Sequence, residues 1–298
     1  MPEECARIGV ATCALAPDLD EDGPLLLDAL RAAGADPRVV RWDDDTVDWG
    51  SFDAVLVRST WDYLLRRHEF LAWSQRCRRT TNPADVLAWN TDKRYLDDLS
   101  RAGVATVPTV FVEPGDAVPH GWASGGDVVV KPAVSGSAAD TGRFRSPDDP
   151  AAAALVATLH AQGRTAMVQP YLPGIDTEGE TSLVFLGGRF SHAVRREPLL
   201  GGDGIRGAVV VADVLATVRA VAPTEAQLAL AERTLDAVPG GRERLGYARV
   251  DVIPGPGGPV LLELEATDCF LFLSFAAPAA RARLAEHVLL PAAGPHPR

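Results

Sequence analysis

The chain has 298 residues, of which 47% are hydrophobic and 23% are charged. This length allows two or three lobes with a substantial core, and this composition excludes wholesale disorder. The net charge of −11 argues against nucleic acid or an anionic membrane as the main partner, but it leaves room for a local basic pocket that binds phosphate.

The cysteine spacing and the hydropathy predict a cytoplasmic protein. Four cysteines are dispersed without a CxxC or Cys/His cluster, so we expect neither a zinc site nor a disulfide framework. The apolar run from Ile8 is short and follows two glutamates, which favours a first strand over a signal peptide. No stretch approaches the ~20 apolar residues that a membrane span needs.

Strands and a helix alternate at the start of the chain. The pattern predicts strands over 8–15, 39–42 and 54–57, with a helix over 25–33. This order indicates a small parallel sheet whose ligand edge lies at the carboxyl ends of its strands. The segment Arg58–Tyr63 follows the last of these strands and therefore lies at that edge.

Two lysines stand at the ends of predicted elements. Lys93 is near the start of a helix that Asn90 or Thr91 would cap. Lys131 ends an apolar strand and enters the small-residue loop 133–139, in which backbone N–H groups could approach a phosphate. The loop does not have the Walker pattern, and the alternative for either lysine is a solvated surface charge.

Other periodic segments predict the remaining elements. We expect helices over 69–78, 147–162, 224–237 and 278–290, and Thr224 with Gln227 should form a capping box at the start of the third. We also expect strands over 106–112, 127–132 and 167–172, and a hairpin of 181–186 with 189–196. Pro173-Gly174 should form an extended linker, and the glycine-rich segment 201–207 should be mobile.

A second hairpin, Tyr247–Glu265, carries the densest charge. Its Pro/Gly turn, 254–259, cannot continue a strand ladder. Alternation places four charged side chains on one face: Arg249, Asp251, Glu263 and Glu265. Folding about Gly257 would set Asp251 opposite Glu263, and a slip of one residue would break this grouping.

This charged face favours a divalent cation. Like charges about 4 Å apart repel by roughly 4 kcal/mol at an effective dielectric near 20. One arginine offsets part of that repulsion, and an all-oxygen set suits a hard ion such as Mg²⁺. The alternative is a solvated face with a surface salt bridge.

The order of the charged and polar positions resembles that of the ATP-grasp ligases over roughly residues 85–275. The resemblance rests on these residues: Lys93, Lys131, Gln169–Leu172, Glu180, Arg249, Asp251, Glu263 and Glu265. It implies an α/β fold with α+β lobes in the ATP-grasp architecture. The implied lobes are an N-terminal Rossmann-like lobe (1–85), a central lid lobe (86–172) and a C-terminal catalytic lobe with an antiparallel sheet (173–298).

The same resemblance implies a role for each position. The residues implied to bind ATP are Lys93, Lys131, Gln169, Tyr171, Leu172 and Glu180. Those implied to bind Mg²⁺, with Mn²⁺ as an alternative, are Asp251, Glu263 and Glu265. The implied catalytic residues are Arg196, Arg206 and Arg249. In the commonest family pattern the metal-binding motif ends in Glu-x-Asn. Here Glu265 stands in place of the asparagine, so the site has one more negative charge.

Four further segments narrow the likeness to the small group of ATP-grasp cyclo-ligases of cycloserine biosynthesis. They are Arg58–Tyr63, Asn82-Pro83, Trp89–Leu96 and Ser191–Val194. The chain departs from that group at Arg196, where lysine is usual, in the run 202–207, and at Asp268–Phe270, where a proline is expected. The acceptor pocket could therefore differ from that of the group. The candidate residues for this pocket are Arg58, Tyr63 and His192, and also Trp61 and Cys269.

The implied reaction joins a carboxylate to an amine through an acyl phosphate, with release of ADP. The substrate would be a small amino-acid-like molecule such as O-ureido-serine, closed into a ring. The alternatives are an intermolecular peptide ligase of the glutathione-synthetase type, a metal-dependent hydrolase, and a nucleotide-binding protein without ligase activity. A homodimer is left open.

Overall fold

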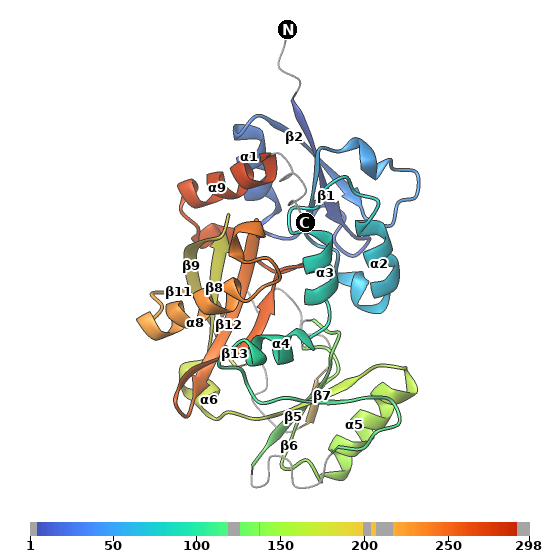
Figure 1. The fold of residues 1–298 in the computed structure, drawn as a ribbon, viewed down its shortest axis with the longest axis vertical. Coiled ribbons are helices and arrows are strands. Elements are labelled where there is room, and N and C mark those ends of the chain that lie inside the picture. Colours follow the sequence, from blue (N-terminus) through green and yellow to red (C-terminus); the bar gives the residue numbers. More distant parts are fainter. Residues whose placement is uncertain (1–4, 119–125, 137, 199–203, 207–216, 291–298) are drawn as a thin grey trace.

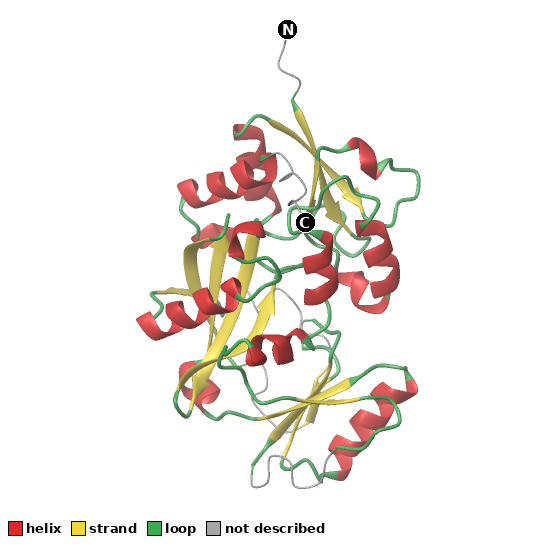
Figure 2. Ribbon diagram, in the orientation of Figure 1, coloured by secondary structure: helices red, strands yellow, loops and turns green. Residues whose placement is uncertain are grey.

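The strands form three sheets in the computed structural model, which describes residues 5–118, 126–136, 138–198, 204–206 and 217–290. Figure 1 shows the sheets stacked along the long axis of the molecule. The sheet that is second in chain order is called the central sheet, and it lies at the bottom of this view. Helices cover each sheet, so the α/β fold class is confirmed (Figure 2). No helix in the described ranges is long and apolar enough to cross a bilayer.

The first sheet has the predicted βαβ order. Its strands pair in parallel in the order β2-β1-β3. The elements here are β1 (Ala6–Thr12), α1 (Gly23–Ala32), β2 (Ala35–Arg41), β3 (Ala54–Val57), a 3₁₀ helix (Trp61–Leu65) and α2 (Arg67–Ser74). Gly34 has φ of +86°, a conformation that suits glycine at a helix end.

The central sheet has the order β10-β6-β5-β7-β4, and α5 packs on it with its own apolar core. Its elements are β4 (Val110–Val112), β5 (Val128–Pro132), β6 (Thr141–Phe144), α5 (Pro150–Ala161), β7 (Ala166–Pro170) and β10 (Gly204–Arg206). Sequence periodicity did not predict the four-residue strand β6. After β7 the chain forms the short helix α6 (Gly174–Glu178), so the prediction of an extended linker was wrong.

The C-terminal sheet is antiparallel, in the order β11-β9-β8-β12-β13. Its elements are β8 (Glu180–Leu186), β9 (Arg189–Arg196), β11 (Arg219–Val221), α8 (Glu225–Asp236), β12 (Tyr247–Gly255), β13 (Gly258–Glu265) and α9 (Pro278–Leu289). The capping box predicted at Thr224 and Gln227 is confirmed. Most of the segment 201–207, predicted to be mobile, lies outside the described residues.

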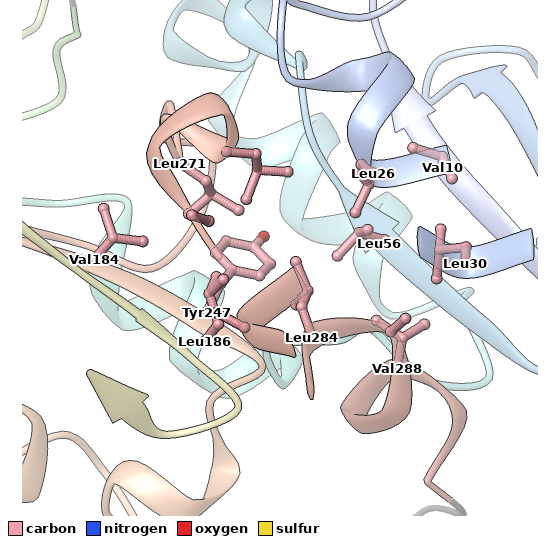
Figure 3. Packing of buried hydrophobic residues seen from close by; sticks show 14 of the residues in the cluster. Val10, Leu26, Leu30, Leu56, Val184, Leu186, Tyr247, Leu271, Leu284 and Val288 are labelled. Carbon is pink, nitrogen blue, oxygen red and sulfur yellow. The ribbon is translucent and has the colours of Figure 1, made fainter. Parts of the chain in front are cut away.

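One apolar core joins the first sheet to the C-terminal sheet. Leu26, Leu30 and Leu56 of the first sheet and its helix pack in the same cluster as Tyr247 of β12 and Leu284 of α9. Figure 3 shows these side chains meeting between the two layers. Burial of this cluster therefore fixes the position of the first sheet relative to the hairpin β12–β13.

The helix that Asn90 or Thr91 was expected to cap begins only at Tyr95, as α4 (Tyr95–Arg101), and a separate short helix, α3 (Ala84–Asn90), precedes it. Asn90 does not cap a helix. Its amide Nδ2 donates to the Leu264 carbonyl and its Oδ1 accepts from the Ala266 N–H. The side chain is buried and satisfies backbone groups at the end of β13 instead of helix N–H groups.

Asn82 makes a similar bridge to the start of β12. Its Nδ2 donates to the carbonyls of Tyr247 and Ala266 at 2.8 and 2.6 Å, and its Oδ1 accepts from the Gly246 N–H at 2.9 Å. Asn82 and Asn90 are the two asparagines of the chain, and both connect the α3 region to the charged hairpin.

We expect Asn82→Ala to lower the free energy of unfolding by about 3 kcal/mol. The substitution strands two carbonyls and an N–H in a buried site, and each unsatisfied group costs ~1–3 kcal/mol with partial relaxation. Urea denaturation followed by circular dichroism measures the change. The exposed Gln162→Ala is the control and should shift stability by less than about 0.5 kcal/mol. Equal urea midpoints for Asn82→Ala and the parent would contradict the bridging role.

Candidate active site

A β-bulge sets the register of the hairpin β12–β13. Near the turn the pairing is centred between Pro256 and Gly257, because Gly255 pairs with Gly258. The register shifts by one residue between Asp251 and Val252, and beyond this shift Asp251 pairs with Glu263. The predicted symmetry about Gly257 is therefore wrong at the turn, whereas the predicted partners of the charged residues are confirmed.

The hairpin brings three carboxylates together. One oxygen each from Asp251, Glu263 and Glu265 lies within 4.8 Å of the other two. Burial raises the pKa of Glu265 to about 7. Burial acts in the same direction on Asp251, but Arg249 and Arg196 overcome it and hold the pKa of Asp251 at about 2.

Arginines link these carboxylates to the neighbouring strands. Arg249 donates from Nε and Nη2 to Asp251 and from Nη2 to Glu265 at 2.7 Å. Arg196 on β9 contacts Asp251 at 3.0 Å and also forms an ion pair with Glu180 on β8. Burial raises the pKa of Glu180 to about 7, although Arg196 opposes the rise. The cluster is thus an alternating network of charges across four strands.

Both lysines of the chain reach the same place. Lys93 Nζ lies 2.7 Å from Glu263 and donates to the Ser135 carbonyl oxygen at 2.6 Å, so it bridges β13 and the small-residue loop. Burial lowers the pKa of Lys131, and the nearby Lys93 lowers it further. Lys93 and Lys131 in turn hold the pKa of Glu263 down against the effect of its burial.

A cavity of about 240 Å³ opens between the central sheet and the C-terminal sheet. Its lining includes most of the residues singled out from the sequence: Tyr63, Lys93, Lys131, Gln169, Tyr171, Leu172, Glu180, Arg196, Arg249, Glu263 and Glu265. Asp251 lies directly behind them through Arg196 and Arg249. Residues far apart in the sequence therefore converge on one concave, water-accessible site.

The far end of the cavity is shaped by the residues that follow β7. Gln169 Nε2 donates to Thr109 Oγ1 at 2.9 Å, which fixes the amide of Gln169. The Tyr171 N–H donates to the Asp127 carbonyl, and the Arg143 guanidinium lies 3.5 Å from the Tyr171 ring centroid. This end offers a rigid wall with aromatic and aliphatic surfaces.

Besides Asp251, two predicted site residues with described side chains, Arg58 and His192, do not line the cavity. Arg58 is fully buried, where it donates to the Cys269 carbonyl and forms an ion pair with Asp20. His192 Nε2 lies 3.0 Å from the Leu271 carbonyl oxygen, and His192 is not among the lining residues. The backbone of Arg206 pairs with Thr141 in the central sheet, and its side chain lies outside the described part of the chain.

Both side chains contact backbone carbonyls of the loop after β13, and the substrate roles of Arg58 and His192 stay predictions. Cys269 in the same loop is also buried, and its burial raises the pKa of its thiol. Asp268, in contrast, lines the cavity together with Trp61 and Phe270. Sequence reasoning noted its position only as a departure from a family pattern.

The carboxylate cluster fits a hard divalent ion. The donor set consists of oxygens alone, and opposite ligands of Mg²⁺ in octahedral geometry lie about 4.2 Å apart. A spread of up to 4.8 Å requires only small side-chain rotations to reach that arrangement. Asp251, Glu263 and Glu265 could therefore hold such an ion together with oxygens of a ligand.

Comparisons with known proteins agree with this geometry. Residues 8–85 match the family model described as the N-terminal domain of the D-cycloserine synthetase DcsG. The cycloserine biosynthesis protein DcsG of Streptomyces lavendulae is 35% identical over 284 residues, which cover 90% of this chain and 93% of that protein.

Solved structures give the same result. The crystal structure of D-cycloserine synthetase DcsG has a TM-score of 0.87 at 33% identity, covering 95% of this chain and 98% of that chain. A RimK domain ATP-grasp protein from Sphaerobacter thermophilus has a TM-score of 0.66 at 20% identity, covering 95% of this chain and all of that one. At this identity the second likeness supports the fold alone.

Proposed function

Because the chain belongs to the DcsG family of ATP-grasp ligases, and is thus an ATP-dependent ligase that forms C–N bonds, we propose that its cavity closes a small amino-acid-like substrate into a ring. The observation that carries this proposal is the convergence of three carboxylates, two lysines and two arginines on one cavity. Such a charge pattern suits a triphosphate and a reacting carboxylate.

The proposed site has two ends. The residues after β7, with Glu180, would hold the nucleoside, and Lys93 and Lys131 would neutralise the phosphates. Arg196 and Arg249 would neutralise the oxygens of the acyl phosphate. Arg249 would also position Asp251 and Glu265, to which it donates hydrogen bonds. Mg²⁺ held by the carboxylate cluster would supply further charge neutralisation for the transferring phosphoryl group.

The reaction would proceed in two displacements. A carboxylate oxygen of the substrate attacks the γ-phosphorus of ATP, which breaks the bond to the β–γ bridging oxygen and releases ADP. The ureido nitrogen bonded to the side-chain oxygen of the same molecule then attacks the acyl carbon and loses its proton, and phosphate leaves as the C–N bond closes a five-membered ring. The protein contributes mainly positioning and charge neutralisation.

We further propose lobe boundaries near residues 85 and 172, as the sequence indicates, and a reducing cytoplasm as the location. The four cysteines are all unpaired in the structure, which supports a reducing compartment.

The proposal predicts that O-ureido-serine, ATP and Mg²⁺ release ADP without any added amine. Attack within one molecule has a high effective molarity, so an external amine should not raise the rate. A coupled ADP assay with mass spectrometry of the product measures this. If ADP appears only after a separate amine or peptide is added, the enzyme is an intermolecular ligase. Reactions without carboxylate substrate are the control for ATP hydrolysis.

A further inference from the structure

Asp268 lies in the loop after β13 with its two carboxylate oxygens in different environments. Oδ2 accepts from the Thr60 N–H at 2.5 Å and from Thr60 Oγ1 at 2.8 Å. Oδ1 is buried and has no hydrogen-bond partner. The residue lines the cavity, and Thr60 holds one of its carboxylate oxygens while the other is left without a donor.

Neighbouring groups leave this oxygen unpaired while holding the loop in place. Arg58, the nearest cation, donates to the Cys269 carbonyl and pairs with Asp20, and no ion pair of Asp268 is found among the described residues. Burial raises the pKa of Asp268 to about 8, although Arg58 opposes the rise, so a cationic donor that binds beside this carboxyl would favour its ionised form. An unpaired buried carboxylate oxygen costs free energy that a bound donor would recover.

The walls beside Asp268 favour a cation over a neutral donor. Trp61, Tyr63 and Phe270 line the same end of the cavity, with the Trp61 and Phe270 ring centroids 6.0 Å apart. Burial raises the pKa of the Tyr63 hydroxyl, and the negative charge of Asp268 adds to the rise. Aromatic faces and a carboxylate both attract an ammonium group, whereas the charge of Asp268 would repel a second carboxylate.

We propose that Asp268 is a substrate-binding residue that receives the ammonium group of the amino-acid substrate, with Thr60 and Arg58 as positioning residues for its loop. This inference rests on the amino-acid-like substrate of the proposed function. With the ammonium at Asp268, the substrate's carboxylate is directed toward Arg249 and the carboxylate cluster on the neighbouring strands. The pocket thereby selects amino acids over simple carboxylic acids.

The test combines a change in the protein with a change in the ligand. Asp268→Asn keeps the shape and an oxygen for Thr60 but removes the charge. We expect it to raise the KM of O-ureido-serine roughly 30-fold, the range of a buried charge-assisted hydrogen bond, with kcat reduced less than roughly threefold. The deamino analogue, 3-(ureidooxy)propanoic acid, should bind the parent and the variant equally well.

Two further variants complete the design. Asp62→Asn removes a carboxylate of the same segment that contacts Trp42 rather than the cavity, and it should leave every constant unchanged. Thr60→Val removes one of the two donors to Asp268 and should raise only the KM of the amine-bearing substrate, roughly fivefold. Melting temperatures and ADP–Mg²⁺ affinity establish that each variant is folded.

Calorimetry with ADP and Mg²⁺ separates this inference from the ligase proposal. Tighter binding of the amino acid than of its deamino analogue, lost in Asp268→Asn, supports the inference even if no ADP is ever released. Equal binding of the two ligands by the parent overturns it while ADP release stands. An equal rise in KM for both ligands in Asp268→Asn also overturns it, since Asp268 would then contact the ureido group or shape the pocket.

Discussion

Replacing Glu263 with glutamine is expected to lower ATP turnover roughly 1000-fold. Glu263 is a member of the three-carboxylate cluster and also contacts Lys93 at 2.7 Å. A metal ligand contributes several kcal/mol to neutralisation of the transferring phosphoryl group, and each 1.36 kcal/mol changes the rate tenfold. The neutral amide would weaken the site for Mg²⁺ and leave Lys93 without its ionic partner.

ADP release in saturating Mg²⁺ measures the loss in Glu263→Gln, and thermal shift with ADP and Mg²⁺ provides a readout that needs no turnover. The parent should gain stability from Mg²⁺ in the presence of ADP, and the variant should not. Glu286→Gln on the exposed side of α9 is the control. Turnover that persists in Glu263→Gln, or in the parent with excess chelator, would refute the metal assignment.

Lys131→Ala should weaken ATP binding roughly 100-fold without lowering the melting temperature of the ligand-free protein. The ammonium group would otherwise contact phosphate oxygens through charge-assisted hydrogen bonds. Burial lowers the pKa of Lys131, which means that its charged form is disfavoured in the empty cavity. Removing the group therefore relieves a desolvation cost in the ligand-free state while it removes a contact in the complex.

Calorimetric titration with a non-hydrolysable ATP analogue measures the affinity of each Lys131 variant. Lys131→Arg keeps the charge with another geometry and should recover part of the binding. Arg38→Ala, which removes an exposed cation from β2, should bind as the parent does. Equal affinity of Lys131→Ala and the parent would make Lys131 a structural residue only.

The regular parts of the fold could be predicted from the sequence because their signals are local. The βαβ order, the capping box at Thr224 and the hairpin turn each depend on residues within about ten positions of one another. The charged face of β12–β13 could also be predicted, since alternation alone places Arg249 and Asp251 on one side.

What failed depends on contacts between distant segments. Asn90 has the residue type of an N-cap, but the unpaired backbone groups of Leu264 and Ala266 bind its amide instead. Arg58 was a candidate for the acceptor pocket, and local sequence does not show that its side chain pairs with Asp20 and donates to the Cys269 carbonyl. The bulge in the hairpin likewise has no local sequence signal.

The core shared by the first and C-terminal sheets has a consequence for how such proteins can recombine. Residues 8–85 match a family model as a unit, yet the apolar faces of Leu26, Leu30 and Leu56 are completed by Tyr247 and Leu284. A segment whose core is finished by residues some 200 positions later cannot be exchanged as an independent module. A chimera that exchanges only the first segment, or only the closing helix, would therefore inherit half of this core.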